Sequence, residues 1–143
     1  MKWWKIFILL LWLTACESKE QREYLDSLGL EFRGVILSME TDIPSSNGFS
    51  IINVSVIHSN IERYDKRGIL SCYYCVIEDG YAQFYPGDIR ECNIGDTIEV
   101  NTSKRLFLVH KTNGEILKKE MIFYDNERFY RYVRRHYRMI FRH

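Results

Sequence analysis

The stretch from Glu31 to Tyr124 alternates short apolar or β-branched runs with residues that favour tight turns. The turn signals are Asp79-Gly80, Pro86-Gly87, Ile94-Gly95-Asp96 and Asn113-Gly114. Strands that recur every roughly 10 to 15 residues between such turns are typical of small antiparallel barrels and sandwiches. We therefore expect a mainly-β fold, a small antiparallel β-barrel or sandwich of OB-fold or SH3-like size.

The expected strands can be placed from these signals. They cover residues 31–39, 49–57, 68–77, 81–85, 97–100, 104–110 and 115–124. Asp79-Gly80 and Asn113-Gly114 predict two-residue hairpins of type I′, because these residues tolerate the positive φ that the turn requires. Pro86-Gly87 predicts the centre of a type II turn. Ile94-Gly95-Asp96 predicts a tight turn before a strand, in which the aspartate serves the architecture.

Two helices are expected to flank the strands. Residues 20–28 have a helical pattern, and Gly29 is a stop signal. Residues 126–141 predict an amphipathic helix with Asp125 or Asn126 as its N-cap. Its apolar face holds Phe129, Val133, Tyr137, Ile140 and Phe141, with Tyr132 and His136 at the margin, and its other face holds Arg128, Arg131, Arg135, Arg138 and Arg142.

The first residues have the pattern of a targeting segment. Lys2 and Lys5 precede a continuous apolar run, Ile6–Leu13. This run is much shorter than the roughly 20 residues that a membrane-spanning helix needs. It has the length and flanks of a secretory signal peptide.

Leu13-Thr14-Ala15-Cys16 has the pattern of a bacterial lipobox, in which a signal peptidase cuts before a cysteine that carries diacylglycerol. We expect residues 1–15 to be a signal peptide, Cys16 the lipid-attachment site, residues 16–22 a polar tether, and residues 23–143 a single β-rich domain. Two or more acyl chains hold a protein stably at a bilayer. The expected location is therefore the cell envelope, lipid-anchored to a membrane on the periplasmic side or the outer surface. The alternative is an ordinary signal peptide with an incidental cysteine.

Charge is distributed unevenly along the chain. Residues 16–125 hold 12 basic and 18 acidic side chains, whereas residues 126–143 hold six arginines against Glu127. These arginines either are solvated or paired with the acidic body, or contact an anionic surface such as lipid headgroups or a polyanionic partner. Arginine interleaved with Tyr and Phe is also typical of nucleic-acid surfaces, but export from the cytoplasm means that we expect no nucleic acid as partner.

Two segments resemble small envelope lipoproteins of uncharacterised function that are abundant in Bacteroidetes. They are Phe32–Ile36 (FRGVI) in the first strand and Ile94–Ile98 (IGDTI), which matches a GDS-I turn and strand. Thr97 stands where that pattern has Ser, and Glu99 where Lys often follows. The resemblance implies a small β-rich domain on a lipid tether and supplies no catalytic residues to carry over to this chain.

Cys72 and Cys75 have the CxxC spacing of redox motifs. A thioredoxin-like pair needs its first cysteine at a helix N-terminus, whereas here Val76–Gly80 continue a strand into a hairpin, and residues three apart on a strand point to opposite faces. Redox catalysis and metal binding by the pair are therefore disfavoured. In an oxidising envelope Cys92 could instead bridge Cys72 or Cys75, and the sequence does not choose between them.

No other pattern indicates catalysis. His58, His110, His136 and His143 lack metal-binding spacing, and no glycine-rich phosphate loop is present. We expect no metal and no cofactor, and a binding or accessory module whose partner is an envelope protein or an anionic lipid surface. The alternative is a periplasmic redox protein or other enzyme that uses Cys72 and Cys75 or a site assembled by the fold.

Overall fold

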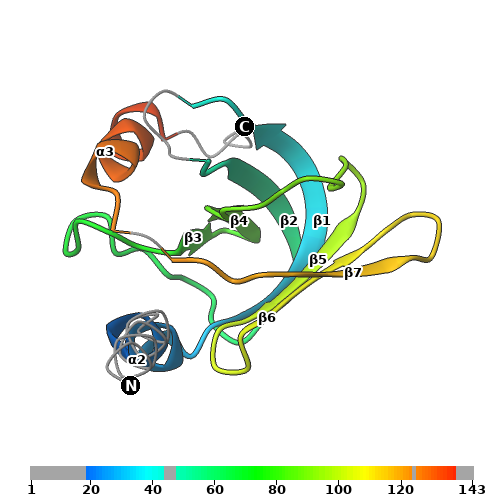
Figure 1. Ribbon diagram of the computed structural model, residues 1–143, viewed down its shortest axis with the longest axis horizontal. Helices are drawn as coiled ribbons and strands as arrows, with labels where there is room; N and C mark the ends of the chain where they lie inside the picture. Colours follow the sequence, from blue (N-terminus) through cyan, green and yellow to red (C-terminus); the bar gives the residue numbers. More distant parts are fainter. Residues whose placement is uncertain (1–18, 44–47, 124, 138–143) are drawn as a thin grey trace, which may run out of the picture.

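The computed structural model describes residues 19–43, 48–123 and 125–137. Two helices and seven strands occur in this part of the chain (Figure 1). In chain order they are α2 (Lys19–Leu28), β1 (Glu31–Glu40), β2 (Ile51–Ser59), β3 (Cys75–Glu78), β4 (Tyr81–Phe84), β5 (Thr97–Asn101), β6 (Leu106–His110), β7 (Ile116–Lys119) and α3 (Glu127–His136).

All seven strands belong to one antiparallel sheet in the order β3-β4-β2-β1-β5-β6-β7. β1 is the central strand, because it pairs with β2 on one side and with β5 on the other. The sheet is not closed, and β3 and β7 are its two ends. For the described residues, the mainly-β antiparallel fold with a C-terminal helix that the sequence predicts is confirmed.

β1 is long and strongly curved (Figure 1), and a glycine near its start brings it unusually close to β2. A Cβ on Gly34 would lie 2.3 Å from the Ser55 carbonyl oxygen and 2.4 Å from Val54 Cγ1. The register between the two strands also shifts beside Gly34, where Ile57 is an extra residue on β2. Such bulges bend a strand and increase its twist. The missing side chain and the bulge together allow β1 and β2 to coil against each other.

The two hairpin turns have different geometries. Asp79 and Gly80, between β3 and β4, have φ of 52° and 79°, so the predicted type I′ turn is confirmed there. Between β6 and β7, Gly114 has φ of 88° but Asn113 does not have a positive φ. The Gly114 N–H donates to the Lys111 carbonyl at 3.0 Å, which is typical of a longer hairpin loop that ends in a left-handed glycine. The second hairpin exists, but its predicted type I′ turn is wrong.

The connection between β4 and β5 also departs from one turn prediction. Gly87 lacks the positive φ that the second central residue of a type II turn requires, so the type II turn at Pro86-Gly87 is wrong. The next turn is as predicted, since Gly95 has φ of 91° and the Asp96 N–H donates to the Asn93 carbonyl at 3.2 Å.

β3 is much shorter than the predicted strand at residues 68–77. In the segment before it, residues 60–74, one residue reaches the outer edge of β3. Tyr64 pairs with Ile77 there through backbone hydrogen bonds of 2.9 and 2.8 Å. This segment therefore covers part of a sheet edge whose polar groups would otherwise be open to other chains.

The core consists of two apolar clusters. The first joins Leu25 of α2 to sheet residues that include Phe32, Ile36, Phe84 and Phe107. The second joins Phe129, Tyr130 and Val133 of α3 to Phe49, Tyr73 and Tyr85. Successive residues of β3 alternate between them: Cys75 and Ile77 lie in the first cluster and Val76 in the second. Each helix thus covers one of the two clusters.

Both helices differ from their predicted bounds. α2 begins at Lys19, so residues 19–22 of the predicted tether are helical. The helix ends before Gly29, as predicted, and Gly29 has a φ of 56°. The Asn126 side chain accepts the Phe129 N–H at 3.1 Å and is the N-cap of α3. α3 ends at His136, and the rest of the predicted helix, beyond residue 137, lies outside the described residues.

Gly34→Ala should lower the free energy of unfolding by at least about 3 kcal/mol, because overpacking alone costs 1–3 kcal/mol and the nearest atom here is backbone. Urea denaturation measures the change. The matched control is Gly68→Ala, where a Cβ meets nothing within 4 Å and φ is not positive; its stability should be unchanged or slightly higher. Equal stability of the two variants would contradict the role given to Gly34.

Candidate functional site

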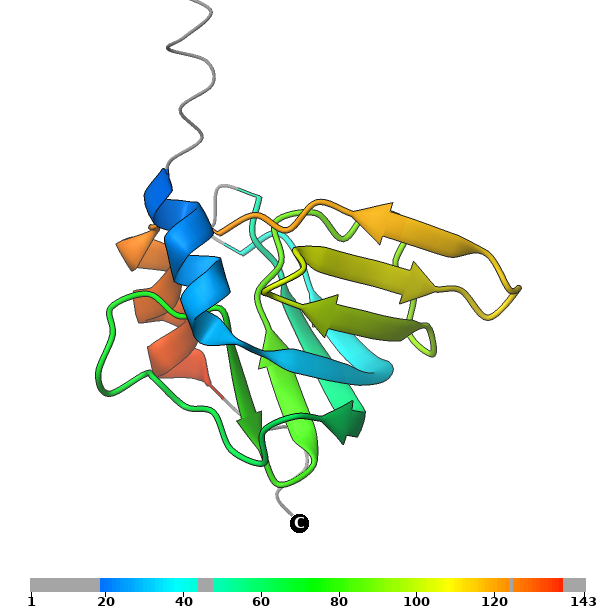
Figure 2. The same ribbon diagram turned by 90° about the horizontal axis from the view of Figure 1, so that it is seen from below.

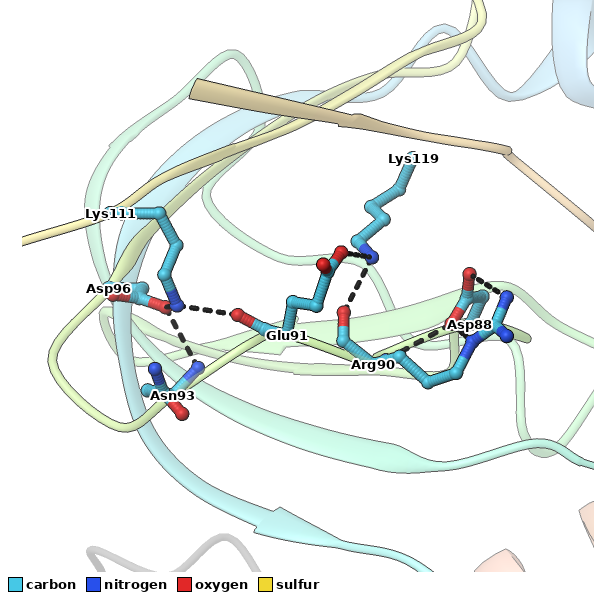
Figure 3. A network of polar contacts seen from close by, with 7 residues as sticks. All are labelled: Asp88, Arg90, Glu91, Asn93, Asp96, Lys111 and Lys119. Carbon is cyan, nitrogen blue, oxygen red and sulfur yellow. Dashed lines mark hydrogen bonds and ion pairs between the residues drawn. The ribbon is translucent and has the colours of Figure 1, made fainter. Parts of the chain in front are cut away.

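A polar network holds the connection between β4 and β5 against the β6–β7 hairpin (Figure 3). Its members are Asp88, Arg90, Glu91, Asn93, Asp96, Lys111 and Lys119. All but the asparagine are titratable. A cluster of interacting titratable groups is a common setting for binding or catalysis, so the network is the first candidate for a site.

Asp96 is the most deeply buried carboxylate of the network, with 1 % of its side chain exposed. Its Oδ2 accepts from Lys111 Nζ at 2.5 Å and from the Asn93 N–H at 2.8 Å, and its Oδ1 accepts from the Thr112 N–H at 3.3 Å. Burial pushes the pKa of Asp96 up, but Lys111 and the two backbone donors outweigh it and hold this pKa below its usual value. Asp96 is therefore ionised at neutral pH.

Lys111 and Lys119 bind backbone carbonyls of the loop between β4 and β5. Lys111 Nζ also donates to the Glu91 carbonyl at 2.5 Å, and the Asn93 amide, with its oxygen facing the ammonium, accepts a third bond at 2.8 Å. Lys119, only 8 % exposed, donates to the Arg90 carbonyl at 2.5 Å and lies 3.3 Å from Glu91 Oε2. Since Glu91 has φ of 68°, the two ammonium groups bind a stretch of backbone in a rarely adopted conformation.

The hydrogen bonds of the network are directed inward. Lys111 has an acceptor for each of its three N–H groups, and the Asp96 carboxylate accepts from three donors. A general base or nucleophile needs a lone pair that can reach a substrate. The arrangement therefore supports an architectural role for the Gly95-Asp96 turn, with the lysines as the loop's anchors.

Asp96→Asn should lower the free energy of unfolding at neutral pH by about 3 kcal/mol, because the variant leaves the Lys111 ammonium buried without a charged partner. The folded pKa of Asp96 lies below its unfolded value. The stabilisation is therefore present above the unfolded pKa of about 4 and is lost as pH falls through the folded pKa. Denaturation curves at a series of pH values should show wild type and variant converging in acid.

The control for this variant is Asp88→Asn. Asp88 pairs with Arg90, whose side chain is 87 % exposed, and exposed ion pairs contribute about 1 kcal/mol or less. If Asp96→Asn costs no more than this control, the buried network does not hold the loop.

The three cysteines of the described chain, Cys72, Cys75 and Cys92, are free thiols in the structure. Cys75 and Cys92 are buried in the first cluster, whereas Cys72 is half-buried against the second. The structure thus has no disulfide among them, unlike the Cys92 bridge that the sequence allows. Of its two candidate partners, only Cys75 shares a cluster with Cys92. Cys72 and Cys75 lie against different clusters, as predicted, but not for the predicted reason, because Cys72 precedes β3 and is not in a strand.

Burial raises the pKa of each of these thiols. Burial and the hydrogen bond that Cys72 Sγ donates to Asp125 Oδ1, at 2.7 Å, raise the pKa of Cys72 to about 11. Burial alone raises the pKa of Cys75, and burial outweighs nearby lysines to raise that of Cys92. Redox and nucleophilic cysteines require a lowered pKa, since the thiolate is the reactive form. The CxxC pair lacks this property.

Iodoacetamide should label Cys72 slowly and Cys75 not measurably in the native protein at neutral pH. The Cys72 rate should rise with pH toward about 11, where its thiolate forms. Peptide mass mapping identifies the labelled sites, and protein unfolded in urea, in which all three react, is the control. Rapid labelling of Cys72 and Cys75 at neutral pH would instead support redox chemistry.

α3 exposes the predicted arginines that lie in its described part. These are Arg128, Arg131 and Arg135, while Arg138 and Arg142 lie outside the described residues. Arg131 Nη2 lies 2.6 Å from Glu127 Oε1, one turn earlier. The buried face holds Phe129 and Val133, as predicted, and also Tyr130, which the sequence analysis missed.

The segment between β2 and β3 carries an exposed apolar pair that the sequence did not predict. Ile69 is 77 % exposed and Leu70 39 %. Both lie in a stretch, GILSC, whose composition predicts a strand, so no local signal indicated a projecting turn. The inward-facing Lys111 and the buried Lys119 were missed for a similar reason, because their acceptors lie 15 to 29 residues away in sequence.

Within residues 19–43, 48–123 and 125–137, no group of three or more His, Cys, Asp or Glu side chains is placed to hold a metal ion. Neither helix of this region is long and apolar enough to cross a membrane. Comparison of the chain with family models, curated proteins and solved structures finds no match.

Proposed function

We propose that the protein is a lipid-anchored binding or accessory module of the bacterial cell envelope, held to a membrane through Cys16. The observation that carries this proposal is the order of features in residues 1–16: two lysines, an apolar run too short to span a bilayer, and Leu13-Thr14-Ala15-Cys16. The Cys16 thiol is the only side chain in this window suited to carrying a thioether-linked lipid.

The start of α2 supports a close attachment. Lys19, its first residue, follows Cys16 by three positions. Even a fully extended link of three residues spans at most about 10 Å. The folded domain would therefore sit directly on the bilayer surface, without the long flexible tether that lets some lipoproteins reach distant partners.

A binding role fits the described side chains better than catalysis does. The thiols of the CxxC pair have raised pKa values, which disfavours the redox alternative. The polar network around Asp96 directs its hydrogen bonds into the loop it holds. The features left for function are surface features, namely the exposed arginines of α3 and the apolar pair at Ile69 and Leu70.

For the architecture, we propose an opened barrel. The curvature of β1 and β2 supports this description (Figure 1). The chain after β7 supports it too, because Phe123 packs against both apolar clusters and stacks on Tyr24 of α2 at 4.3 Å. α2 and this segment would fill the space between the two ends of the sheet.

The anchor is tested by the intact mass of full-length protein made in a bacterial host and extracted from membranes. The expected mass lacks residues 1–15 and includes two or three acyl chains. Cys16→Ala should retain the leader and carry no acyl mass, whereas the control Cys72→Ala should be processed and acylated like wild type. Wild-type protein that retains Met1, or a processed chain without added acyl mass, would refute the proposal.

A further inference from the structure

We propose that the turn at Ile69 and Leu70, together with the basic groups around it, is a second membrane contact that inserts among anionic lipid headgroups. The inference rests on the proposed lipid anchor and specifies which face of the domain meets the bilayer. The turn lies in segment 60–74, where the sequence predicts a polar connection followed by a strand that starts at residue 68.

The turn presents two adjacent aliphatic side chains to solvent. The N–H groups of Ile69 and Leu70 both donate to the Lys66 carbonyl, at 3.0 and 2.8 Å, so the backbone of the turn is closed on itself. The side chains remain 77 % and 39 % exposed. The other large exposed aliphatics of the described chain, Ile57, Ile94 and Ile116, each lie alone in sequence. Single exposed aliphatics are ordinary, whereas here one closed turn holds two adjacent ones at the surface.

The turn is held in place from α3. The Arg67 guanidinium stacks on the Tyr137 ring at 3.5 Å and bonds Asp65 at 2.6 Å. Arg134 Nη1 donates to the Ser71 carbonyl at 3.0 Å. Both sides of the turn are therefore tied to the end of α3, which fixes the position of the apolar pair.

The charges beside the apolar pair suit an anionic lipid. An open hollow of about 470 Å³ lies against Ile69, with Arg63 and Lys66 in its wall. The acidic residue in the same wall, Asp65, is bonded to Arg67. Arg63 lies 3.6 Å from Glu78 Oε1 but keeps 72 % of its side chain exposed. Aliphatic side chains flanked by cations are the composition of surfaces that lie at a membrane interface, with the cations among the headgroups.

The position of the turn agrees with the anchor. α2, segment 60–74 and α3 lie at one end of the molecule in both views, and the β6–β7 hairpin lies at the other (Figures 1 and 2). The chain enters this end at Lys19, within three residues of Cys16. A bilayer that holds Cys16 is therefore within reach of the Ile69 turn, while the hairpin that carries Ile116 points away from it.

A tryptophan probe tests this orientation. All three tryptophans of the chain, Trp3, Trp4 and Trp12, precede Cys16 and are replaced by Phe in every protein used. Ile69→Trp and, as the matched control, Ile116→Trp then each carry a single tryptophan at a site of similar exposure, 77 % and 59 % in the parent. Full-length protein is incorporated into vesicles of equal parts phosphatidylglycerol and phosphatidylethanolamine that contain brominated acyl chains.

The emission of Ile69→Trp should shift to shorter wavelength and be quenched by the brominated chains, and that of Ile116→Trp should do neither. Added salt, or phosphatidylcholine in place of phosphatidylglycerol, should weaken the quenching, since screening reduces the attraction of Arg63 and Lys66 to the headgroups. Equal behaviour of the two probes would overturn the inference. So would a shift in Ile69→Trp that depends on protein concentration without lipid, because a second copy of the chain would then cover the turn.

The intact mass of the same samples separates this result from the anchor. Acylated protein whose Ile69→Trp probe stays in water would refute the second contact and leave the proposed anchor intact. Unacylated protein whose Ile69→Trp probe is still selectively quenched would refute the anchor and retain the contact.

Discussion

The close approach of β1 and β2 at Gly34 is the constraint on which the rest of the sheet depends. β1 pairs on both sides, so every other strand is positioned directly or through a neighbour by its curvature. A side chain at Gly34 would overlap the carbonyl of Ser55. Because Gly34 has only hydrogen there, the two strands can bend together. The sheet therefore curves, but β3 at one end and β7 at the other do not pair, and the sheet stays open.

An open, strongly curved sheet leaves space that other parts of the chain must fill. Aromatic side chains do so at the α3 end, where Tyr73, Tyr85, Phe129 and Tyr130 contact one another with ring centroids 5.0 to 6.1 Å apart. Buried ions do so at the β6–β7 end, where Asp96, Lys111 and Lys119 hold a long loop. The aromatic cluster and the ion network differ chemically, but both hold irregular backbone in place.

Local sequence signals predicted the elements better than their ends. Asp79-Gly80 and Gly95 formed the expected turns because the φ values they adopt are set within a few residues. Pro86-Gly87 and Asn113 did not, since the surrounding loops select the turn type there. Of the predicted strand at 68–77, only residues 75–77 belong to β3, because Ile69 and Leu70 form a separate turn closed on the Lys66 carbonyl. The candidate functional residues were predicted least well, because neither the two lysines nor the exposed Ile69 and Leu70 have a signature in the neighbouring sequence.

What the sequence determined by itself was the mainly-β class, a terminal helix capped at Asp125 or Asn126, and the turns at Asp79-Gly80 and Gly95. Each follows from chain periodicity or from bonds that span a few residues. Only the tertiary structure decided that the sheet stays open, that Lys111 faces inward and Lys119 is buried, and that the Ile69 turn is tied to α3. These outcomes depend on partners distant in sequence, and a side chain's own chemistry does not specify which distant carbonyl, carboxylate or ring it will meet.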